Sequence, residues 1–254
     1  MKIQVLVASM HQNDHSLPDK MNIKTDVIIG NQCDRNSIET YEDNGRQICY
    51  LNFAERGVGL NRNNALMRAN ADICLFADDD MVYCDDYVET VETAFKENPK
   101  ADVIVFNLIE EKVSRYIIPK KKKVGRLNYL RYGTARIAVR FKAIKENAIY
   151  FNQCFGGGTE HSHGEDNLFL TACLNKKLKV IAVPKFIAKL TEERESTWLN
   201  GYNEKFLIDQ GYLYRAISRR WWKLLCLQDA IRKHKTYGVS MLKAYKTMTS
   251  IKKK

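Results

Sequence analysis

Proline, glycine and long apolar runs are all scarce in this chain. Its 254 residues include 4 prolines and 13 glycines, which excludes a low-complexity or collagen-like protein. No apolar stretch approaches the roughly 20 residues that a helix needs to span a bilayer. No segment recurs at the periods of about 20–50 residues that mark solenoids. Residues 1–9 are too short for a signal-peptide core and are expected to form a buried first strand.

Paired cysteines are not indicated either. The 7 cysteines are odd in number, and they include no C-x-x-C pair and no zinc-like spacing. This pattern is typical of reduced thiols and predicts a cytoplasmic chain. Apolar residues make up 45% of the sequence, which is enough for one sizeable core.

The charge is distributed unevenly along the chain. The net charge is +11, but residues 1–111 hold 10 basic and 20 acidic residues. Residues 112–145 hold 12 basic residues and no acidic ones, and residues 212–254 hold 12 and 1. We therefore expect a domain over residues 1–211 whose first part is acidic, and two basic segments, 112–145 and 212–254, with an anionic partner. Solvated loops or tails are the alternative explanation of such segments.

Short apolar runs alternate with amphipathic stretches over the first half of the chain. This alternation predicts an α/β fold with a Rossmann-like, mostly parallel central sheet flanked by helices. The expected strands are Ile3–Ser9, Asp26–Asn31, Gln47–Asn52, Ile73–Ala77, Val103–Leu108 and Leu178–Val183, and the expected helices are Leu60–Ala69 and Asp85–Asn98. Ligands of such folds bind beyond the carboxyl ends of the strands.

Three consecutive carboxylates, Asp78, Asp79 and Asp80, follow the fourth expected strand. In an extended chain, Asp78 and Asp80 point to one side and repel each other unless a cation neutralises them. Oxygen ligands of this kind suit Mg2+ or Mn2+. The alternative is a solvated acidic turn that precedes the next helix.

Two further motifs accompany this turn. Residues 57–66 (GVGLNRNNAL) open a helix just before the strand that ends in the acidic turn, and glycines at a helix entry favour phosphate or simply a tight turn. Downstream, residues 155–158 (FGGG) precede an acidic pair that opens a helix, residues 164–170 (GEDNLFL). Together with residues 69–80 (ANADICLFADDD), this order resembles family 2 glycosyltransferases with the GT-A fold, of the bacterial surface-polysaccharide type.

The resemblance implies roles for individual residues. Asp80 is expected to be the principal ligand of Mn2+ or Mg2+, and Asp78 to contact the metal or the ribose of a nucleotide sugar. Asp34 is expected to contact the base or ribose, and Arg62 the nucleotide. The backbone around Ala8 is expected near the base, although many members carry a proline-containing turn there and this chain does not.

The acidic pair of the second motif has a separate role in the family. Asp166 matches the general base of inverting members, and Glu165 accompanies it at the acceptor substrate. The alternative for Asp166 is a first-turn residue that stabilises the helix dipole. His161 and His163 lie nearby and could be metal ligands, but polar loop residues are the more common case.

The C-terminal segment predicts a basic helical appendage over residues 212–254. Its apolar residues are expected on one helical face: Leu213, Ile217, Trp221, Leu224, Leu225, Leu227 and Ile231. Arg215, Arg219 and Lys223 form a basic stripe on another face. An interfacial helix at an anionic membrane and a helix packed on the domain both fit this pattern.

We therefore predict a metal-dependent, inverting hexosyltransferase. The implied donor is a nucleotide-diphosphate sugar, with UDP as the expected carrier, bound by residues 1–111. The implied acceptor is a hydroxyl of a glycan or lipid-linked oligosaccharide, bound by residues 112–211, in surface-polysaccharide synthesis at the inner face of the cell membrane. The alternatives are a nucleic-acid-binding protein that uses the two basic segments, which the acidic turn disfavours, and a non-catalytic protein that binds sugar nucleotides.

Overall fold

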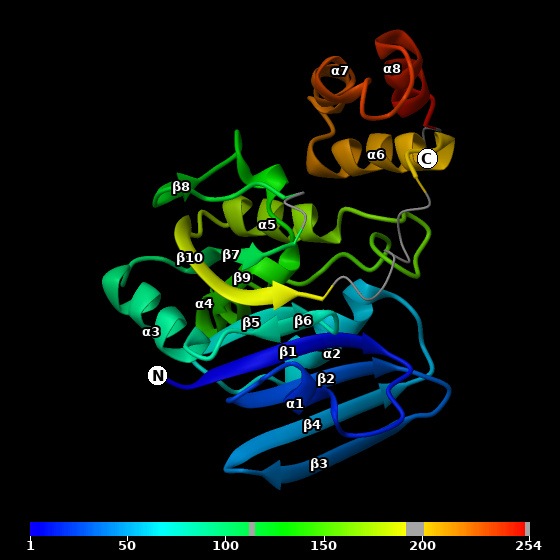
Figure 1. The fold of residues 1–254 in the computed structure, drawn as a ribbon. Coiled ribbons are helices and arrows are strands. Elements are labelled where there is room, and N and C mark those ends of the chain that lie inside the picture. Colours follow the sequence, from blue (N-terminus) through cyan, green and yellow to red (C-terminus); the bar gives the residue numbers. More distant parts are fainter. Residues whose placement is uncertain (112–114, 192–200, 252–254) are drawn as a thin grey trace.

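The computed structural model describes residues 1–111, 115–191 and 201–251. These residues form one ten-stranded sheet with helices on both faces, and a group of helices beyond it (Figure 1). The strands are β1 (Ile3–Met10), β2 (Asp26–Gln32), β3 (Ser37–Asp43), β4 (Arg46–Phe53), β5 (Ile73–Asp78), β6 (Met81–Tyr83), β7 (Val103–Ile109), β8 (Lys122–Val124), β9 (Ile137–Arg140) and β10 (Val180–Leu190). The helices are α1 (Leu17–Lys20), α2 (Val58–Arg68), α3 (Tyr87–Glu97), α4 (Phe141–Glu146), α5 (Glu165–Asn175), α6 (Glu204–Ile217), α7 (Trp222–Lys233) and α8 (Met241–Thr249), with short 3-10 turns η1 (Tyr129–Arg131) and η2 (Thr134–Arg136).

The strand order is β3-β4-β2-β1-β5-β9-β7-β10-β6, and β8 pairs with β10. Strands β4, β2, β1 and β5 are parallel, as are β7 and β10. All six strands predicted from continuous apolar runs are present, and both predicted helices form. The first strands therefore bring their carboxyl ends to one edge, as the α/β prediction requires.

The sheet is nevertheless mixed, because four unpredicted strands pair antiparallel with their neighbours. Strand β9 runs antiparallel between β5 and β7, while β3, β6 and β8 lie at or near the edges. Strands β6 and β8 have only three residues each, too few to show a periodicity. Strand β3 alternates between half-buried and exposed side chains, as expected of an edge strand.

Alternate residues of the sheet pack into two separate cores. Val5 and Val7 of β1 face α1 and α3, whereas Leu6 faces α2 and α5. This is the period-2 alternation of a strand with helices on both sides. The strands are consequently apolar throughout, which is the signal that identified them in the sequence.

Helices α6, α7 and α8 form a small helical unit with its own core (Figure 1). Gly211 makes it compact: a Cβ there would lie 1.9 Å from the Met248 carbonyl oxygen, so only glycine lets α6 and α8 cross so closely. Residue 212, where the sequence predicted the appendage to begin, lies inside α6. The predicted single apolar face is wrong, because the chain breaks between Ile217 and Trp222 and divides those residues between α6 and α7.

None of the helices in the described ranges has the length and apolar content needed to cross a membrane.

Candidate active site

The start of α2 is fastened to the carboxyl ends of β1 and β2. The Asn61 side-chain amide donates hydrogen bonds to the carbonyl oxygens of Gly30 (2.7 Å) and Ser9 (3.3 Å). A Cβ on Gly30 would lie 2.0 Å from the Asn61 Oδ1, so a side chain at position 30 would displace Asn61. These hydrogen bonds of Asn61 place the neighbouring Arg62, in the motif of residues 57–66, at the edge of the sheet.

The glycine-rich loop of the second motif packs against the same helix end. The Val58 N–H donates to the Gly157 carbonyl over 2.9 Å. Gly156 has a φ of 99°, and a Cβ there would lie 2.7 Å from the Glu165 Oε2. The two motifs, about a hundred residues apart in the chain, therefore form one structure.

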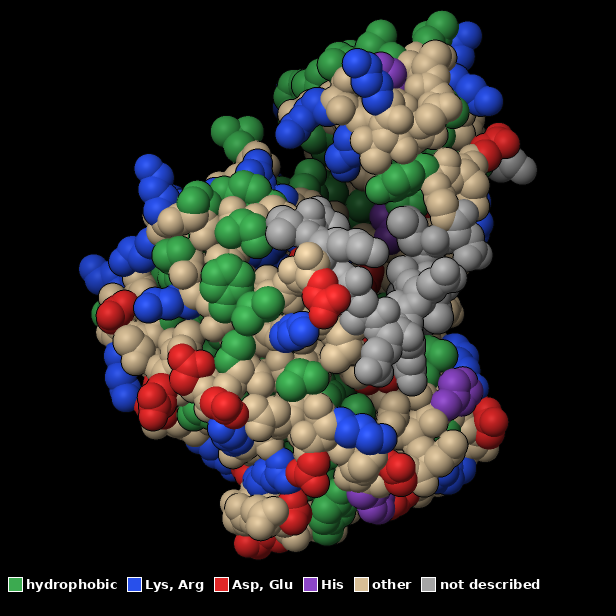
Figure 2. Space-filling model, in the orientation of Figure 1, with side chains coloured by type: hydrophobic (Ala, Val, Ile, Leu, Met, Phe, Trp, Pro, Cys, Tyr) green, Lys and Arg blue, Asp and Glu red, His purple; other side chains and the backbone are tan. Residues whose placement is uncertain are grey.

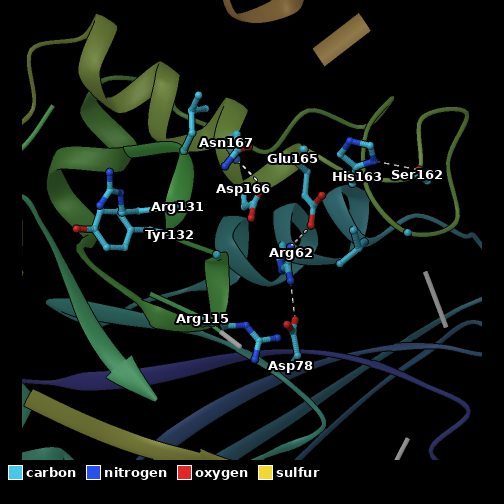
Figure 3. A pocket seen from close by; sticks show the side chains of 15 residues that line it. Arg62, Asp78, Arg115, Arg131, Tyr132, Ser162, His163, Glu165, Asp166 and Asn167 are labelled. Atoms are coloured by element: carbon cyan, nitrogen blue, oxygen red, sulfur yellow. Dashed lines mark hydrogen bonds and ion pairs between the residues drawn. The ribbon is translucent and has the colours of Figure 1, made fainter. Parts of the chain in front are cut away.

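Arg62 is the centre of this structure. Its side chain is only 4% exposed, and its guanidinium contacts the Asp78 carboxylate over 2.6 Å and the Glu165 carboxylate over 2.8 Å (Figure 3). Burial alone would lower the pKa of Arg62, but the two carboxylates outweigh burial and raise the pKa. Arg62 therefore links α2, β5 and α5 as a permanent cation. Its expected contact with a nucleotide stays a prediction.

The three carboxylates of the acidic turn differ in their surroundings. Asp79 accepts hydrogen bonds from the Ser9 hydroxyl (3.0 Å) and the Gln12 amide (3.3 Å), which tie it to the end of β1. Asp80 is half-buried, and burial together with the charges of Asp78 and Asp79 raises its pKa to about 6. The turn therefore gathers three carboxylates, of which Asp78 is paired with Arg62 and Asp80 is half-buried.

These two carboxylates fit a divalent cation. Both side chains offer carboxylate oxygens, which suit Mg2+ or Mn2+, and they belong to one turn that also carries Asp79. Within the described residues, no group of three or more His, Cys, Asp or Glu side chains could hold a metal. A bound ion would therefore need further ligands from a diphosphate or from water.

Asp166 lies at the first turn of α5, next to Glu165 (Figure 3). Its Oδ1 accepts a hydrogen bond from the Asn167 N–H over 2.6 Å. Burial and the neighbouring charge of Glu165 raise the pKa of Asp166 to about 7. A carboxylate with such a pKa can accept a proton near neutral pH.

A cavity of about 420 Å³ lies between several of these groups, and Asp80 is not among its described lining residues. Of the predicted site residues, Arg62, Asp78, Glu165 and Asp166 line it together (Figure 3). The remaining lining residues of the described chain are Val58, Arg115, Leu130, Arg131, Tyr132, Gly133, Gly157, Ser162, His163, Gly164 and Asn167. Arg115 and Arg131 were not predicted individually as site residues. Both belong to the basic segment 112–145, which is visible in the sequence.

Two predicted substrate contacts lie elsewhere. The Asp34 side chain is 90% exposed and pairs with Arg56 over 3.0 Å. Ala8 is buried in β1, where it lies between Gly30 of β2 and Asp78 of β5. Neither residue lines the cavity described above, and their contacts with a base or ribose stay predictions.

His161 and His163 connect the site to the helical unit. The His161 Nδ1 lies 3.1 Å from the Asp209 Oδ1, and the His163 Nε2 lies 2.8 Å from the Gln210 Oε1. Because an amide oxygen only accepts, the His163 Nε2 must carry the proton. Gly164 permits this contact, since a Cβ there would lie 2.7 Å from Leu213 of α6. One ring nitrogen of each histidine thus contacts a side chain of α6.

Comparison with known proteins identifies the family. The family described as glycosyl transferase family 2 matches residues 22–155, which is more than half of the chain. The chain belongs to glycosyl transferase family 2. This glycosyltransferase has no significant match among curated proteins.

Solved structures show the fold of this glycosyltransferase. A crystal structure of S. aureus TarS 1–349 in complex with UDP-GlcNAc superimposes with a TM-score of 0.65 at 16% identity, covering 99% of this chain and 77% of that one. A longer S. aureus TarS chain gives a TM-score of 0.63 at 16% identity and covers 98% of this chain. This chain spans 55% of that longer TarS. The mixed α/β fold is therefore the predicted GT-A fold.

Proposed function

We propose that this glycosyltransferase moves a hexose from a UDP-sugar to a hydroxyl of a glycan or lipid-linked oligosaccharide, with inversion at the sugar C1. The observation that carries the proposal is the single cavity lined by Arg62, Asp78, Glu165 and Asp166. The complex of the structurally similar TarS with UDP-GlcNAc supports the choice of UDP. A lipid-linked acceptor places the enzyme at the inner face of the cell membrane, in surface-polysaccharide synthesis.

In this mechanism Asp166 is the general base. Its carboxylate accepts the proton of the acceptor hydroxyl as that oxygen forms a bond to C1 and the bond from C1 to the diphosphate breaks. Attack from the face opposite the leaving group inverts the configuration at C1. Glu165 is paired with Arg62 over 2.8 Å, and we assign the proton to Asp166, whose pKa is raised.

The charge on the leaving diphosphate is the second requirement of the reaction. Asp78 and Asp80 would hold Mn2+ or Mg2+, and such a cation supplies electrostatic stabilisation of the departing phosphate oxygens. Arg62 holds Asp78 in place through its 2.6 Å contact. Arg115 and Arg131 add positive charge to the same cavity.

A panel of nucleotide sugars with Mn2+, read as released nucleoside diphosphate, tests the proposed donor. We expect release from UDP-sugars above that from GDP- or CMP-sugars. Equal background with every donor in the presence of glycan acceptors would contradict the proposal.

Replacing Asp80 with alanine is expected to weaken UDP binding in the presence of Mn2+. Loss of a residue outside the coordination sphere typically costs about 10–100-fold in metal affinity, so loss of a ligand is expected to cost at least about tenfold. Isothermal titration of UDP with and without Mn2+ measures the effect. Asp79→Asn is the matched control, because Asp79 is held by Ser9 and Gln12. Equal UDP affinity in Asp80→Ala and wild type would remove Asp80 from the metal site.

The transfer rate is expected to rise with pH through about 7. Burial and the charge of Glu165 raise the pKa of Asp166, with a smaller contribution from Asp78, while Arg62 and the Asn167 N–H act in the opposite direction. Below this pKa the base is protonated and inactive, so activity is lost as the pH falls. Initial rates at saturating donor between pH values of about 6 and 8 measure the profile. A flat profile would contradict the assignment of Asp166 as base.

A further inference from the structure

The helical unit formed by α6, α7 and α8 carries exposed apolar side chains that no part of the described chain covers. On α7, Leu224 is 57% exposed, Leu227 37% and Ile231 53%, and Trp221 just before the helix is 54% exposed. Spacings of three and four residues put the three α7 side chains on one face. An apolar stripe of this kind on the surface indicates a binding partner.

The exposure of these side chains does not result from an incomplete core of the helical unit. Helix α7 has a second apolar face, on which Trp222, Leu225, Cys226 and Ala230 pack into the unit's core. Asp229 and Tyr237 close that core with a hydrogen bond between their side chains. The core of the unit is therefore complete without the outer stripe of Leu224, Leu227 and Ile231.

The start of α8 carries further exposed apolar side chains, and the unit also carries exposed basic side chains. Met241 is 44% exposed and Leu242 58%. Exposed basic residues of the unit are Arg219, Arg220, Lys223, Arg232, Lys233, Lys235, Lys243 and Lys246. Over residues 212–254 the one acidic residue is Asp229, which is buried and paired with Lys233 over 3.1 Å. Figure 2 shows basic and hydrophobic side chains together over α7 and α8, whereas acidic side chains gather on the lower part of the body.

We propose that this outer face of α7 and α8 docks on an anionic lipid bilayer. Aliphatic side chains enter the acyl region while the lysines and arginines contact the charged headgroups, and each such basic residue adds to the attraction. Nucleic acid fits less well, because Trp221 is the one aromatic residue among the exposed apolar side chains named above, and the others offer a base no stacking. Net positive charge also disfavours a second copy of the same face, since the two faces would repel each other.

The proposal deepens the proposed function, on which it rests for the lipid-linked acceptor. Helix α6 of the docking unit is fastened to the cavity wall through His163 and Gln210, and through Leu213 against Gly164. Asp166 lies two residues after Gly164 in the chain. The bilayer would therefore have a fixed position relative to Asp166. A substrate anchored in the membrane would be delivered to a site that is held at the membrane.

Flotation of the full chain with vesicles tests this docking surface. We expect the chain to float with vesicles containing phosphatidylglycerol and to stay behind with pure phosphatidylcholine, and flotation to decrease as salt is added. Leu224→Glu with Ile231→Glu is expected to weaken partitioning more than about tenfold, because it removes two inserted side chains and adds two negative charges. Ile38→Glu with Met67→Glu is the matched control: both residues are exposed, by 63% and 57%, the charge change is the same, and they lie on β3 and α2.

Three outcomes would overturn the proposal. Failure of the wild type to float with anionic vesicles would do so, as would equal loss in the control variant. A dimer in light scattering that Leu224→Glu with Ile231→Glu converts to monomer would assign the face to a second copy instead. Titration with UDP separates this result from the proposed function, because the α7 variant is expected to bind UDP like the wild type whether or not it binds vesicles.

Discussion

Replacement of Asp166 with asparagine is expected to lower sugar transfer by about 10²–10⁴-fold, the usual contribution of a general base. Asparagine keeps the size of the side chain and can still accept the 2.6 Å hydrogen bond from the Asn167 N–H. It cannot accept the proton of the acceptor hydroxyl. UDP binding is expected to be unchanged, because Asp78 and Asp80 remain. Transfer assays and UDP titration on the same preparation measure both quantities.

The control for this variant is Glu97→Gln, which removes one carboxylate from the exposed end of α3. It is expected to retain wild-type transfer and UDP affinity. Full transfer by Asp166→Asn would remove Asp166 from the mechanism. Parallel loss of transfer and of UDP binding would instead assign Asp166 to the donor site, which also contradicts the general-base role.

The sequence predicted those parts of the molecule in which one periodicity dominates. Strand β5 is apolar from Ile73 to Ala77 because helices cover both its faces, and that run is readable without a structure. The carboxylates after it could be placed at the sheet edge for the same reason. Strands such as β8, with Lys122 and Lys123 in its three residues, carry no such signal, since their pairing with β10 is decided by tertiary contacts.

The composition of the site was predicted better than its contacts. Spacing alone cannot show that Arg62 meets Glu165, because the two residues are 103 positions apart. The resemblance identified Arg62 as a nucleotide contact, whereas the structure surrounds its guanidinium with two carboxylates of the protein. Asp34 follows the end of β2, as predicted, but its side chain pairs with Arg56.

The C-terminal helices show where helical periodicity misleads. Leu213 and Leu224 were placed on one face of a single helix, yet a break between α6 and α7 sends Leu213 against Gly164 and leaves Leu224 exposed. Trp222 packs into the core of the helical unit and Trp221 is exposed, and the interfacial role of the segment stays a prediction. The break lies at Ser218–Trp221, in a sequence without proline or glycine, so no turn signal announced it.

Substitution of Arg62 by methionine is expected to destabilise the chain by about 3–5 kcal/mol, mainly because it leaves the largely buried Glu165 carboxylate without its cationic partner. Arg62 is 4% exposed and contacts Asp78 at 2.6 Å and Glu165 at 2.8 Å; solvent offsets part of the loss at Asp78, which is 40% exposed, but less at Glu165, which is 14% exposed. In a chain of this size, a loss of 1 kcal/mol lowers the melting temperature by about 2–4 °C. Thermal unfolding would therefore show a decrease of roughly 6–20 °C.

The origin of this loss can be tested by removing the charges that Arg62 neutralises. Adding Asp78→Asn and Glu165→Gln to Arg62→Met is expected to restore part of the melting temperature, since the amides need no counter-ion. Arg56→Met is the matched control: Arg56 also pairs with an aspartate, at 3.0 Å, but it is 40% exposed and its pair with Asp34 lies at the surface. Its loss is expected to cost less than about 1 kcal/mol. Equal destabilisation by Arg56→Met and Arg62→Met, or no recovery in the triple variant, would mean that charge neutralisation is not what Arg62 contributes.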